Sequence, residues 1–265
     1  MIAILYISFD RDGLALLQSV RSARRTFGEE VNICIYDDAT NPLDEAILDV
    51  VRPYYYAKTT WARGGNLNGI AAVEGVLSCF ADVVNRTCAD FVIKIDCDTI
   101  IQSTTWLDFS GKWALQGFTT IPPCLAQGMC YCLRADAPTT ILNAIKGRTF
   151  VSNATRQVLH EDSTISFLTT IYFPGAVRIY DTAAGAVPRR VACGVHYLSN
   201  ELLAQQAELI KSYDVVTFGD RWTIPQHVQV NQRHLVAQAM QRYLDNELPL
   251  LPDCNLDPIS HDDKI

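Results

Sequence analysis

The sequence has no apolar stretch of the length that a transmembrane helix needs, and no basic segment followed by an apolar core at its start. It has no run of lysine and arginine long enough for a nucleic-acid patch. A net charge of −7 argues against strong electrostatic binding to anionic lipid. We therefore expect a cytoplasmic protein that binds no nucleic acid, although the sequence stays compatible with peripheral contact at the inner face of the membrane.

Cysteine pairs at metal-ligand or redox spacing are also missing. The nine cysteines are scattered and odd in number, no C-x-x-C occurs, and Cys130 and Cys132 form the closest pair. This pattern favours free, buried thiols in a reducing compartment over a disulfide framework. The 265 residues, of which 49% are hydrophobic, suffice for one large domain with a sizeable core, or for one and a half domains.

Strand and helix patterns alternate along the first hundred residues. Continuous apolar runs predict strands, and apolar residues at helical spacing predict the helices between them. This alternation favours an α/β fold with a parallel, doubly wound sheet in this half. The expected order is strand 2–8, helix 14–27, strand 31–36, helix 42–51, strand 54–56, helix 67–84 and a strand from 91 onward.

The second half of the chain is less regular. We expect one α/β domain over residues 1–200, with halves of about 1–100 and 101–200, and a C-terminal helical extension and tail over 201–265. The expected elements are strands at 113–118 and 128–134, a helix with Pro138 in its first turn, a helix at 163–171, a strand at 177–180 and an amphipathic helix from Pro225 to about 247.

Two aspartates, Asp96 and Asp98, follow a buried-strand pattern that begins at Phe91. In open α/β sheets, ligands bind outside the carboxyl ends of the strands. Carboxylates at i and i+2 on an extended chain point the same way, and they repel each other unless a cation lies between them. Mg²⁺ or Mn²⁺ prefers oxygen ligands and keeps places for substrate phosphates. The stretch therefore predicts a metal-bound diphosphate; the alternative is a chance D-x-D in a solvated turn.

Residues at two other predicted element ends suit a nucleotide. Asp37 and Asp38 end the second predicted strand, where a carboxylate can accept hydrogen bonds from ribose hydroxyls or a base N–H. A turn before Pro42 favours aspartate equally.

Arg63 and the two glycines after it precede a predicted helix, and a helix N-terminus attracts phosphate. A plain loop is the alternative there, because the segment matches neither glycine-rich phosphate motif.

Glu161 and Asp162 lie at a predicted helix start. Acidic residues are common there because they suit the helix dipole and cap the first turn. The functional interpretation is a general base aimed at an acceptor hydroxyl. His196 is either a structural histidine or a metal ligand that would suit Mn²⁺, and His160 flanks the acidic pair.

The order of these parts resembles that of the GT-A fold glycosyltransferases, which are metal-dependent nucleotide-sugar transferases. That family has a D-x-D at a strand end, a glycine-bearing loop, an E-D motif at a helix start and a C-terminal metal-binding histidine. The resemblance covers residues 2–200. The matching positions, in the same order, are Asp96-Cys97-Asp98, Gly128, His160-Glu161-Asp162 and His196.

The resemblance implies a GT-A-like, Rossmann-type mixed sheet flanked by helices. It also implies a transferase that moves a sugar from a nucleotide-diphosphate-sugar, foremost a UDP-sugar, to a hydroxyl-bearing glycan or glycolipid, with Mn²⁺ or Mg²⁺ as cofactor. We expect an inverting reaction in surface polysaccharide or lipopolysaccharide biosynthesis. The implied residues are Asp162 and Glu161 for catalysis, Ser8, Asp37, Asp38, Arg63, Asp96 and Gly128 for donor binding, and Asp96, Asp98 and His196 for the metal.

The chain departs from the processive polysaccharide synthases, because its E-D helix lacks their longer arginine and tryptophan pattern and no transmembrane segment follows. Its glycine loop has one glycine rather than two. One alternative is a sugar-1-phosphate nucleotidyltransferase, which normally carries a G-x-x-x-R signature after the first strand, and residues 8–13 do not match it. The other is a non-catalytic nucleotide-sugar-binding protein, which the intact carboxylates at all three candidate sites disfavour.

Overall fold

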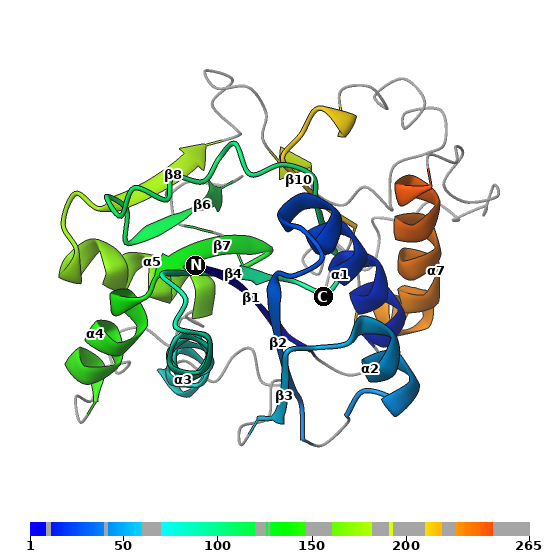
Figure 1. Ribbon diagram of the computed structural model, residues 1–265, viewed down its shortest axis with the longest axis horizontal. Coiled ribbons are helices and arrows are strands. Elements are labelled where there is room, and N and C mark those ends of the chain that lie inside the picture. Colours follow the sequence, from blue (N-terminus) through cyan, green and yellow to red (C-terminus); the bar gives the residue numbers. More distant parts are fainter. Residues whose placement is uncertain are drawn as a thin grey trace, which may run out of the picture.

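The computed structural model describes residues 1–8, 12–39, 42–59, 70–119, 126, 128–146, 161–181, 191–192, 210–218 and 226–245. A seven-stranded sheet with the order β3-β2-β1-β4-β7-β6-β8 lies at its centre (Figure 1). The strands are β1 (Ile2–Ile7), β2 (Asn32–Asp37), β3 (Tyr55–Lys58), β4 (Phe91–Ile95), β6 (Leu115–Thr119), β7 (Cys130–Arg134) and β8 (Val177–Asp181).

The sheet is mixed. β1 pairs in parallel with both β2 and β4, and β2 pairs in parallel with β3, as the alternating pattern of the first half predicts. β7 runs antiparallel to its neighbours β4 and β6, and β6 and β8 are parallel. The α/β class with a mixed, Rossmann-type sheet is therefore confirmed. β1, β2 and β4 consequently end at the same edge, which is where the candidate site residues of the first half lie.

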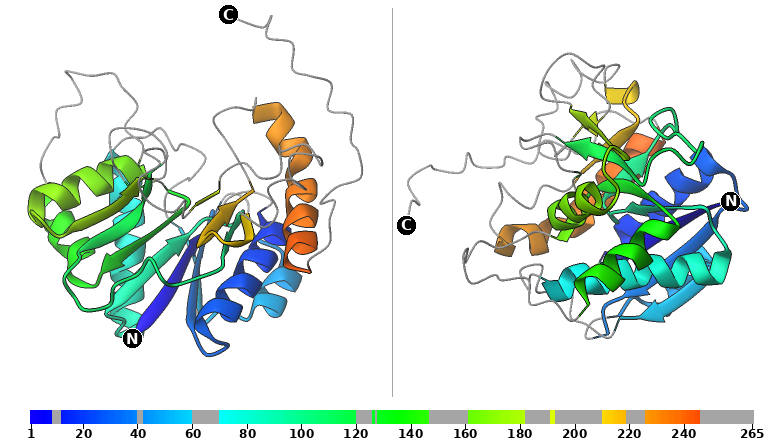
Figure 2. Two further views of the ribbon diagram at one scale, coloured as in Figure 1. Left: turned by 90° about the horizontal axis from the view of Figure 1, so that it is seen from above. Right: turned by 90° about the vertical axis from the view of Figure 1, so that its left-hand side faces the viewer.

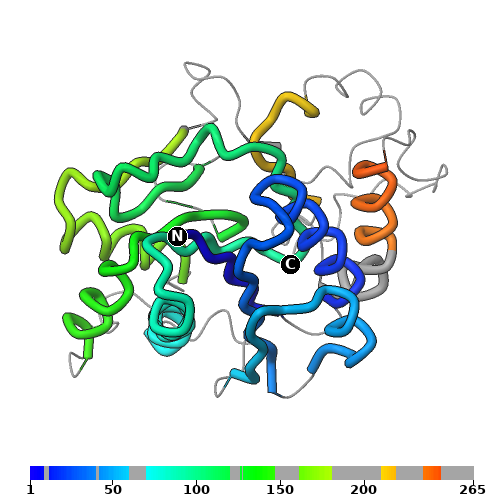
Figure 3. Tube along the Cα trace, viewed as in Figure 1, coloured from blue at the N-terminus to red at the C-terminus, as the bar shows by residue number. Residues whose placement is uncertain are grey.

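Helices cover both faces of the sheet (Figures 1 and 2). The side chains of β1 alternate between the two faces: Leu5 belongs to the core on one side, and Tyr6 belongs to the core on the other. The first face carries α3 (Ile70–Thr87), α4 (Asp136–Ile145) and α5 (Glu161–Tyr172). The second face carries α1 (Gly13–Phe27) and α2 (Glu45–Val51), and α7 (Gln226–Leu244) lies alongside α1 (Figure 3).

Local chemistry determines where the helices begin and end. α1 ends at Phe27 because Gly28 adopts a φ of 98°, which a residue without a Cβ reaches without strain. α2 begins at Glu45 rather than at Pro42, because the carboxylate of Asp44 accepts the Ala46 N–H at 2.9 Å and so caps the first turn.

A second, three-stranded sheet was not expected from the sequence. It has the order β5-β10-β9, with β5 (Thr99–Ile101), β10 (Val215–Thr217) and β9 (Val191–Ala192). β5 and β10 are antiparallel, and β10 and β9 are parallel. The chain therefore leaves the main sheet at the end of β4 and enters the smaller sheet within a few residues. The boundary at residue 200 stays a prediction, although β10 and α7 both pack onto elements of the first hundred residues.

Two further expectations from the sequence concern the state of the cysteines and the lack of a transmembrane helix. The six cysteines of the described ranges are free thiols, and all of them except Cys88 are buried. Within the same ranges, every helix is too short or too polar to pass through a bilayer.

Candidate active site

The D-x-D forms a turn between β4 and β5. The Thr99 N–H donates to the Asp96 carbonyl at 3.0 Å, and the Asp96 N–H donates to the Met129 carbonyl at 2.9 Å. The expectation that both carboxylates project from one extended strand is therefore wrong, because the chain turns between them to reach the second sheet. Asp96 and Asp98 are both only partly buried, as residues at a strand end that meets solvent should be.

Lys94 links the D-x-D to the glycine loop. Its side chain is 2% exposed, and its Nζ donates to Asp96 Oδ1 at 2.6 Å and to the Gly128 carbonyl at 2.5 Å. A lysine is almost never buried to this degree unless it is paired. Sequence reasoning missed this residue, although a single lysine inside the apolar run of β4 was the available signal.

Gly128 in turn contacts the E-D helix. Its N–H donates to Asp162 Oδ2 at 2.6 Å. A Cβ at this position would lie 3.1 Å from the same oxygen, which is tighter than an ordinary contact. Three separate motifs of the sequence, namely the D-x-D, the glycine loop and the E-D helix, therefore meet through hydrogen bonds that run from Asp96 through Lys94 and Gly128 to Asp162.

Asp162 has an unusual environment for a carboxylate near a helix start. Its Oδ1 accepts the Ser163 N–H at 2.6 Å, so both of its oxygens hold backbone donors. Burial, and next the neighbouring charge of Glu161, raise the pKa of the Asp162 carboxyl above its ordinary value, while the two N–H donors and Lys94 oppose this change. A raised pKa makes the ionised carboxylate a stronger base.

Tyr131 is a second residue that sequence reasoning missed. It lies directly opposite Lys94 in the β4–β7 pair, and the Lys94 Nζ is 5.6 Å from the centre of its ring. Its hydroxyl is buried and has no hydrogen-bond partner among the residues that the structure describes. Burial, with the negative charge of Glu161 second, raises the pKa of this phenol well above its ordinary value, so it stays neutral.

Ser8 and Asp37 lie together at the ends of β1 and β2. The Ser8 hydroxyl donates to Asp37 Oδ1. Asp37 Oδ2 accepts the Leu43 N–H at 2.5 Å and the Tyr56 hydroxyl at 2.9 Å, and the residue is fully buried. The Asp37 carboxylate therefore ties β1, β2 and β3 together at the edge where the candidate nucleotide site begins, and Asp38 follows it with 2% of its surface exposed.

Replacing Tyr56 with phenylalanine should lower the free energy of unfolding by about 1–2 kcal/mol, because a hydrogen bond to a buried carboxylate is lost. Tyr54→Phe is the matched control. Tyr54 is 59% exposed and its hydroxyl bond to the Arg86 carbonyl is 3.5 Å long, so we expect a change within about 0.5 kcal/mol. Urea unfolding followed by circular dichroism measures both, and equal effects would contradict a special role for Tyr56.

Three residues of the expected site lie outside the described ranges, namely Arg63, His160 and His196. Of the others, the structure joins Asp96, Gly128 and Asp162 through Lys94, and it places Asp98 next to Asp96 in the same turn. Glu161 precedes Asp162 at the start of α5. Ser8 and Asp37 form a separate group at the ends of β1 and β2.

The chemistry of the D-x-D fits a divalent cation. Two partly exposed carboxylates supply hard oxygen ligands, and Mg²⁺ or Mn²⁺ commonly takes one or two carboxylates and completes its shell with water and substrate phosphates. Among the described residues, no group of three or more histidine, cysteine, aspartate or glutamate side chains is placed to hold a metal. A cation held by Asp96 and Asp98 would therefore take its remaining ligands from a bound substrate, from water or from residues outside those ranges.

Comparison with known proteins extends this picture. No protein-family model matches the chain, and no curated protein sequence matches it either. Among solved structures, the chain is similar to a glycosyltransferase involved in the glycosylation of the major capsid of PBCV-1, with a TM-score of 0.50 and 10% identity over 91% of this chain and 98% of that one. It is similar to an active-site mutant of LgtC, with a TM-score of 0.50 and 12% identity over 96% of this chain and 98% of that one.

These identities are low, but the alignments span nearly the whole of each chain, so the likeness concerns the entire arrangement of strands and helices. The strand order and the helices on both faces agree with it. The chain has the GT-A-like fold of glycosyltransferase structures.

Proposed function

We propose that the protein transfers a sugar from a nucleotide-diphosphate-sugar, foremost a UDP-sugar, to a hydroxyl of a glycan or glycolipid. The observation that carries the proposal is the hydrogen-bonded path from Asp96 through Lys94 and Gly128 to Asp162. This path holds the carboxylates suited to a donor diphosphate beside a carboxylate suited to an acceptor hydroxyl. The GT-A-like fold supports the same activity.

The donor would lie at the shared edge of β1, β2 and β4. Asp96 and Asp98, with His196, would hold Mn²⁺ or Mg²⁺, which when bound neutralises charge on the diphosphate leaving group. Asp38 and Arg63 would contact the nucleotide. Ser8 and Asp37 would support the donor site indirectly. The hydrogen bonds of Asp37 with Ser8, Leu43 and Tyr56 hold the ends of the strands at this edge in place.

Asp162 is the proposed general base, and its burial, followed by the charge of the neighbouring Glu161, raises the pKa of its carboxyl. Each carboxylate oxygen can accept more than one hydrogen bond, so the N–H donors of Gly128 and Ser163 leave capacity for an acceptor hydroxyl. Proton removal by Asp162 implies inversion at the anomeric carbon. Surface polysaccharide or lipopolysaccharide biosynthesis, on the cytoplasmic side, remains the proposed setting.

The direct test is a screen of UDP-, GDP-, CMP- and dTDP-sugars for Mn²⁺-dependent hydrolysis and for thermal stabilisation of the protein. We expect one nucleotide-sugar to be hydrolysed and to raise the melting temperature only with the metal present. Pyrophosphate release from a nucleoside triphosphate and a sugar phosphate would instead identify a nucleotidyltransferase. Binding of a nucleotide-sugar without turnover would identify a non-catalytic binding protein.

Asp162→Asn should lower the transfer rate by about 10²–10⁴-fold, the usual contribution of a general base, with little change in donor affinity. Asparagine keeps an oxygen that can accept the Gly128 N–H, so the loop should stay in place. Transfer kinetics and donor titration measure the two effects. Equal losses in both would favour a structural role, and a retained anomeric configuration in the product, read by NMR, would remove Asp162 from the base role.

The raised pKa of Asp162 also predicts the sign of a pH effect on stability. The folded protein binds this proton more tightly than the unfolded chain, whose aspartates titrate near about 3.9. The contribution of Asp162 to stability is therefore largest below about 3.9 and falls as the pH rises through the folded-state pKa. Asp162→Asn should flatten this part of the pH profile of unfolding, and an unchanged profile would contradict the environment described for this residue.

A further inference from the structure

The segment that contains β10, residues 210–218, packs directly on the strand that follows the D-x-D. β10 pairs antiparallel with β5, in the register Thr217 to Thr99 and Val215 to Ile101. β5 belongs to the smaller sheet, and among the residues that the structure describes it pairs with no strand of the seven-stranded sheet. The course of the chain after Asp98 therefore depends on a segment more than a hundred residues further along the sequence.

Two contacts from this segment reach Asp98 itself. The Phe218 N–H donates to the Asp98 carbonyl at 2.9 Å. The Thr99 hydroxyl donates to Thr217 Oγ1 at 3.0 Å, and the Thr217 hydroxyl, 3.5 Å from Asp98 Oδ1, donates to that carboxylate. Thr99 and Thr217 are both buried, so the two hydroxyls form a chain that is shielded from water and ends on the Asp98 side chain.

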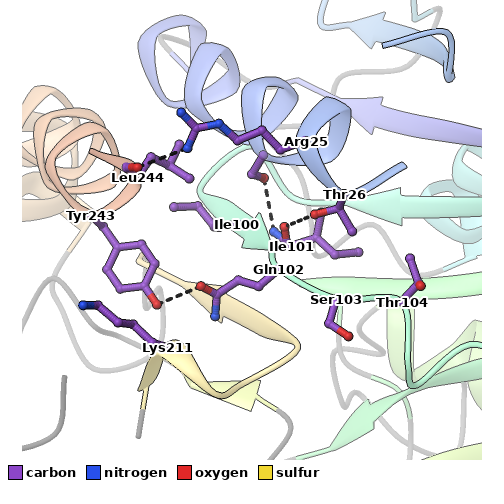
Figure 4. Close-up of a pocket in the computed structure, with 11 residues that line it drawn as sticks. Arg25, Thr26, Ile100, Ile101, Gln102, Ser103, Thr104, Lys211, Tyr243 and Leu244 are labelled. Atoms are coloured by element: carbon purple, nitrogen blue, oxygen red, sulfur yellow. Dashed lines mark hydrogen bonds between the residues drawn. The ribbon is translucent and has the colours of Figure 1, made fainter. Parts of the chain in front are cut away.

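The other end of β5 is held by the same part of the chain. A cavity of about 540 Å³ lies between α1, β5, residue Lys211 and α7, and Figure 4 shows the side chains that line it. Two of the lining residues bond each other, because the Tyr243 hydroxyl donates to Gln102 Oε1 at 2.9 Å. Gln102 Nε2 also donates to the carbonyl of Tyr213, just before β10, at 2.8 Å. These hydrogen bonds therefore hold α7 and residues 210–218 against the end of β5.

We propose that Thr217 is a positioning residue for the metal site, because its hydroxyl restrains the orientation of the Asp98 carboxylate, which would ligate the metal. The inference rests on the proposed function in one respect, the assignment of Asp98 as a metal ligand. It adds a residue from the C-terminal part of the chain to a site whose other described members come from residues 8–162. Hydrogen bonds to ligating carboxylates fix their orientation, and loss of such a partner typically costs about 10–100-fold in metal affinity or activity.

The test compares Thr217→Val with Thr217→Ser. Valine keeps the shape of threonine and removes the hydroxyl, whereas serine keeps the hydroxyl. We expect Thr217→Val to weaken Mn²⁺ binding about tenfold, the lower end of that range because the contact is long, and Thr217→Ser to stay near the wild type. Mn²⁺ is titrated in the presence of UDP by calorimetry, and the Mn²⁺ dependence of kcat/KM is measured beside it.

Thr105→Val is the matched control. The Thr105 hydroxyl donates to Asp214 Oδ1 at 2.7 Å, so it fastens the same segment at a point away from the D-x-D. We expect this variant to lower the melting temperature without changing Mn²⁺ affinity. If both valine variants, or neither, change Mn²⁺ affinity, the inference is overturned. A wild type that binds Mn²⁺ and UDP but transfers no sugar would contradict only the proposed function, whereas a wild type that binds neither would contradict both.

Discussion

Lys94→Met should destabilise the protein by about 3 kcal/mol. Removing one partner of a buried ion pair typically costs about 3–5 kcal/mol, and we expect the lower end because the Asp96 side chain is 26% exposed and can regain some water. Methionine has a similar length and no donor, so the Gly128 carbonyl also loses its hydrogen bond. Urea unfolding followed by circular dichroism measures the change.

Lys146→Met is the control for the loss of a lysine charge. Lys146 is exposed at the end of α4, so its replacement should change stability by no more than about 0.5 kcal/mol. The double variant Lys94→Met with Asp96→Asn separates charge from packing. If the unpaired Asp96 carboxylate causes the loss, the double variant should recover part of the stability. A cost for Lys94→Met no larger than that of the control would show that the buried pair contributes nothing.

Donor transfer should fall with Lys94→Met even where the protein remains folded. The lysine holds the D-x-D and the glycine loop at fixed distances, and a misplacement of about 1 Å at a reacting centre can cost about 100-fold in rate. The double variant reports on stability alone, because Asp96→Asn also removes a proposed metal ligand. Transfer by the single variant Lys94→Met at the wild-type rate would show that Lys94 serves stability only.

Asp98→Asn should abolish metal-dependent donor binding while leaving the fold intact. A neutral amide is a poor ligand for a hard divalent cation, so we expect the Mn²⁺-dependent affinity for the donor to fall by more than about 100-fold. Asp98 is partly exposed, and asparagine keeps an oxygen that can accept the Thr217 hydroxyl. The melting temperature without donor should therefore stay close to that of the wild type.

Titration of Mn²⁺ and a UDP-sugar, followed by thermal shift and by donor hydrolysis, measures this effect. Asp49→Asn is the matched control, since it removes one negative charge from an exposed position of α2 and should leave both readouts unchanged. A variant at position 98 that still turns over the donor at the wild-type rate with Mn²⁺ would remove Asp98 from the metal site. Melting well below the wild type without donor would instead make Asp98 a structural residue.

Local sequence patterns were sufficient for most of the architecture. Apolar runs and helical spacing predicted the strands of the parallel half and the helices between them, because both patterns report which face of an element is buried. The D-x-D was correctly placed at the end of β4, and the E-D pair at the start of α5. These features depend on residues that are close to one another in the sequence, so the sequence alone is enough to predict them.

Tertiary structure alone decided how these parts meet. The antiparallel pairing of β4 and β7 brings Lys94 opposite Tyr131 and the Gly128 carbonyl within reach of Lys94, and the position of α5 places Asp162 beside the Gly128 N–H. No local pattern specifies that register, because it arises from packing between segments far apart in the sequence. The pairing of β5 with β10 also joins segments far apart in the sequence. In addition, both strands have only three residues, which is too few for a recognisable periodicity. The sequence by itself therefore determined which chemical groups the site contains, and long-range strand pairing determined which of them touch.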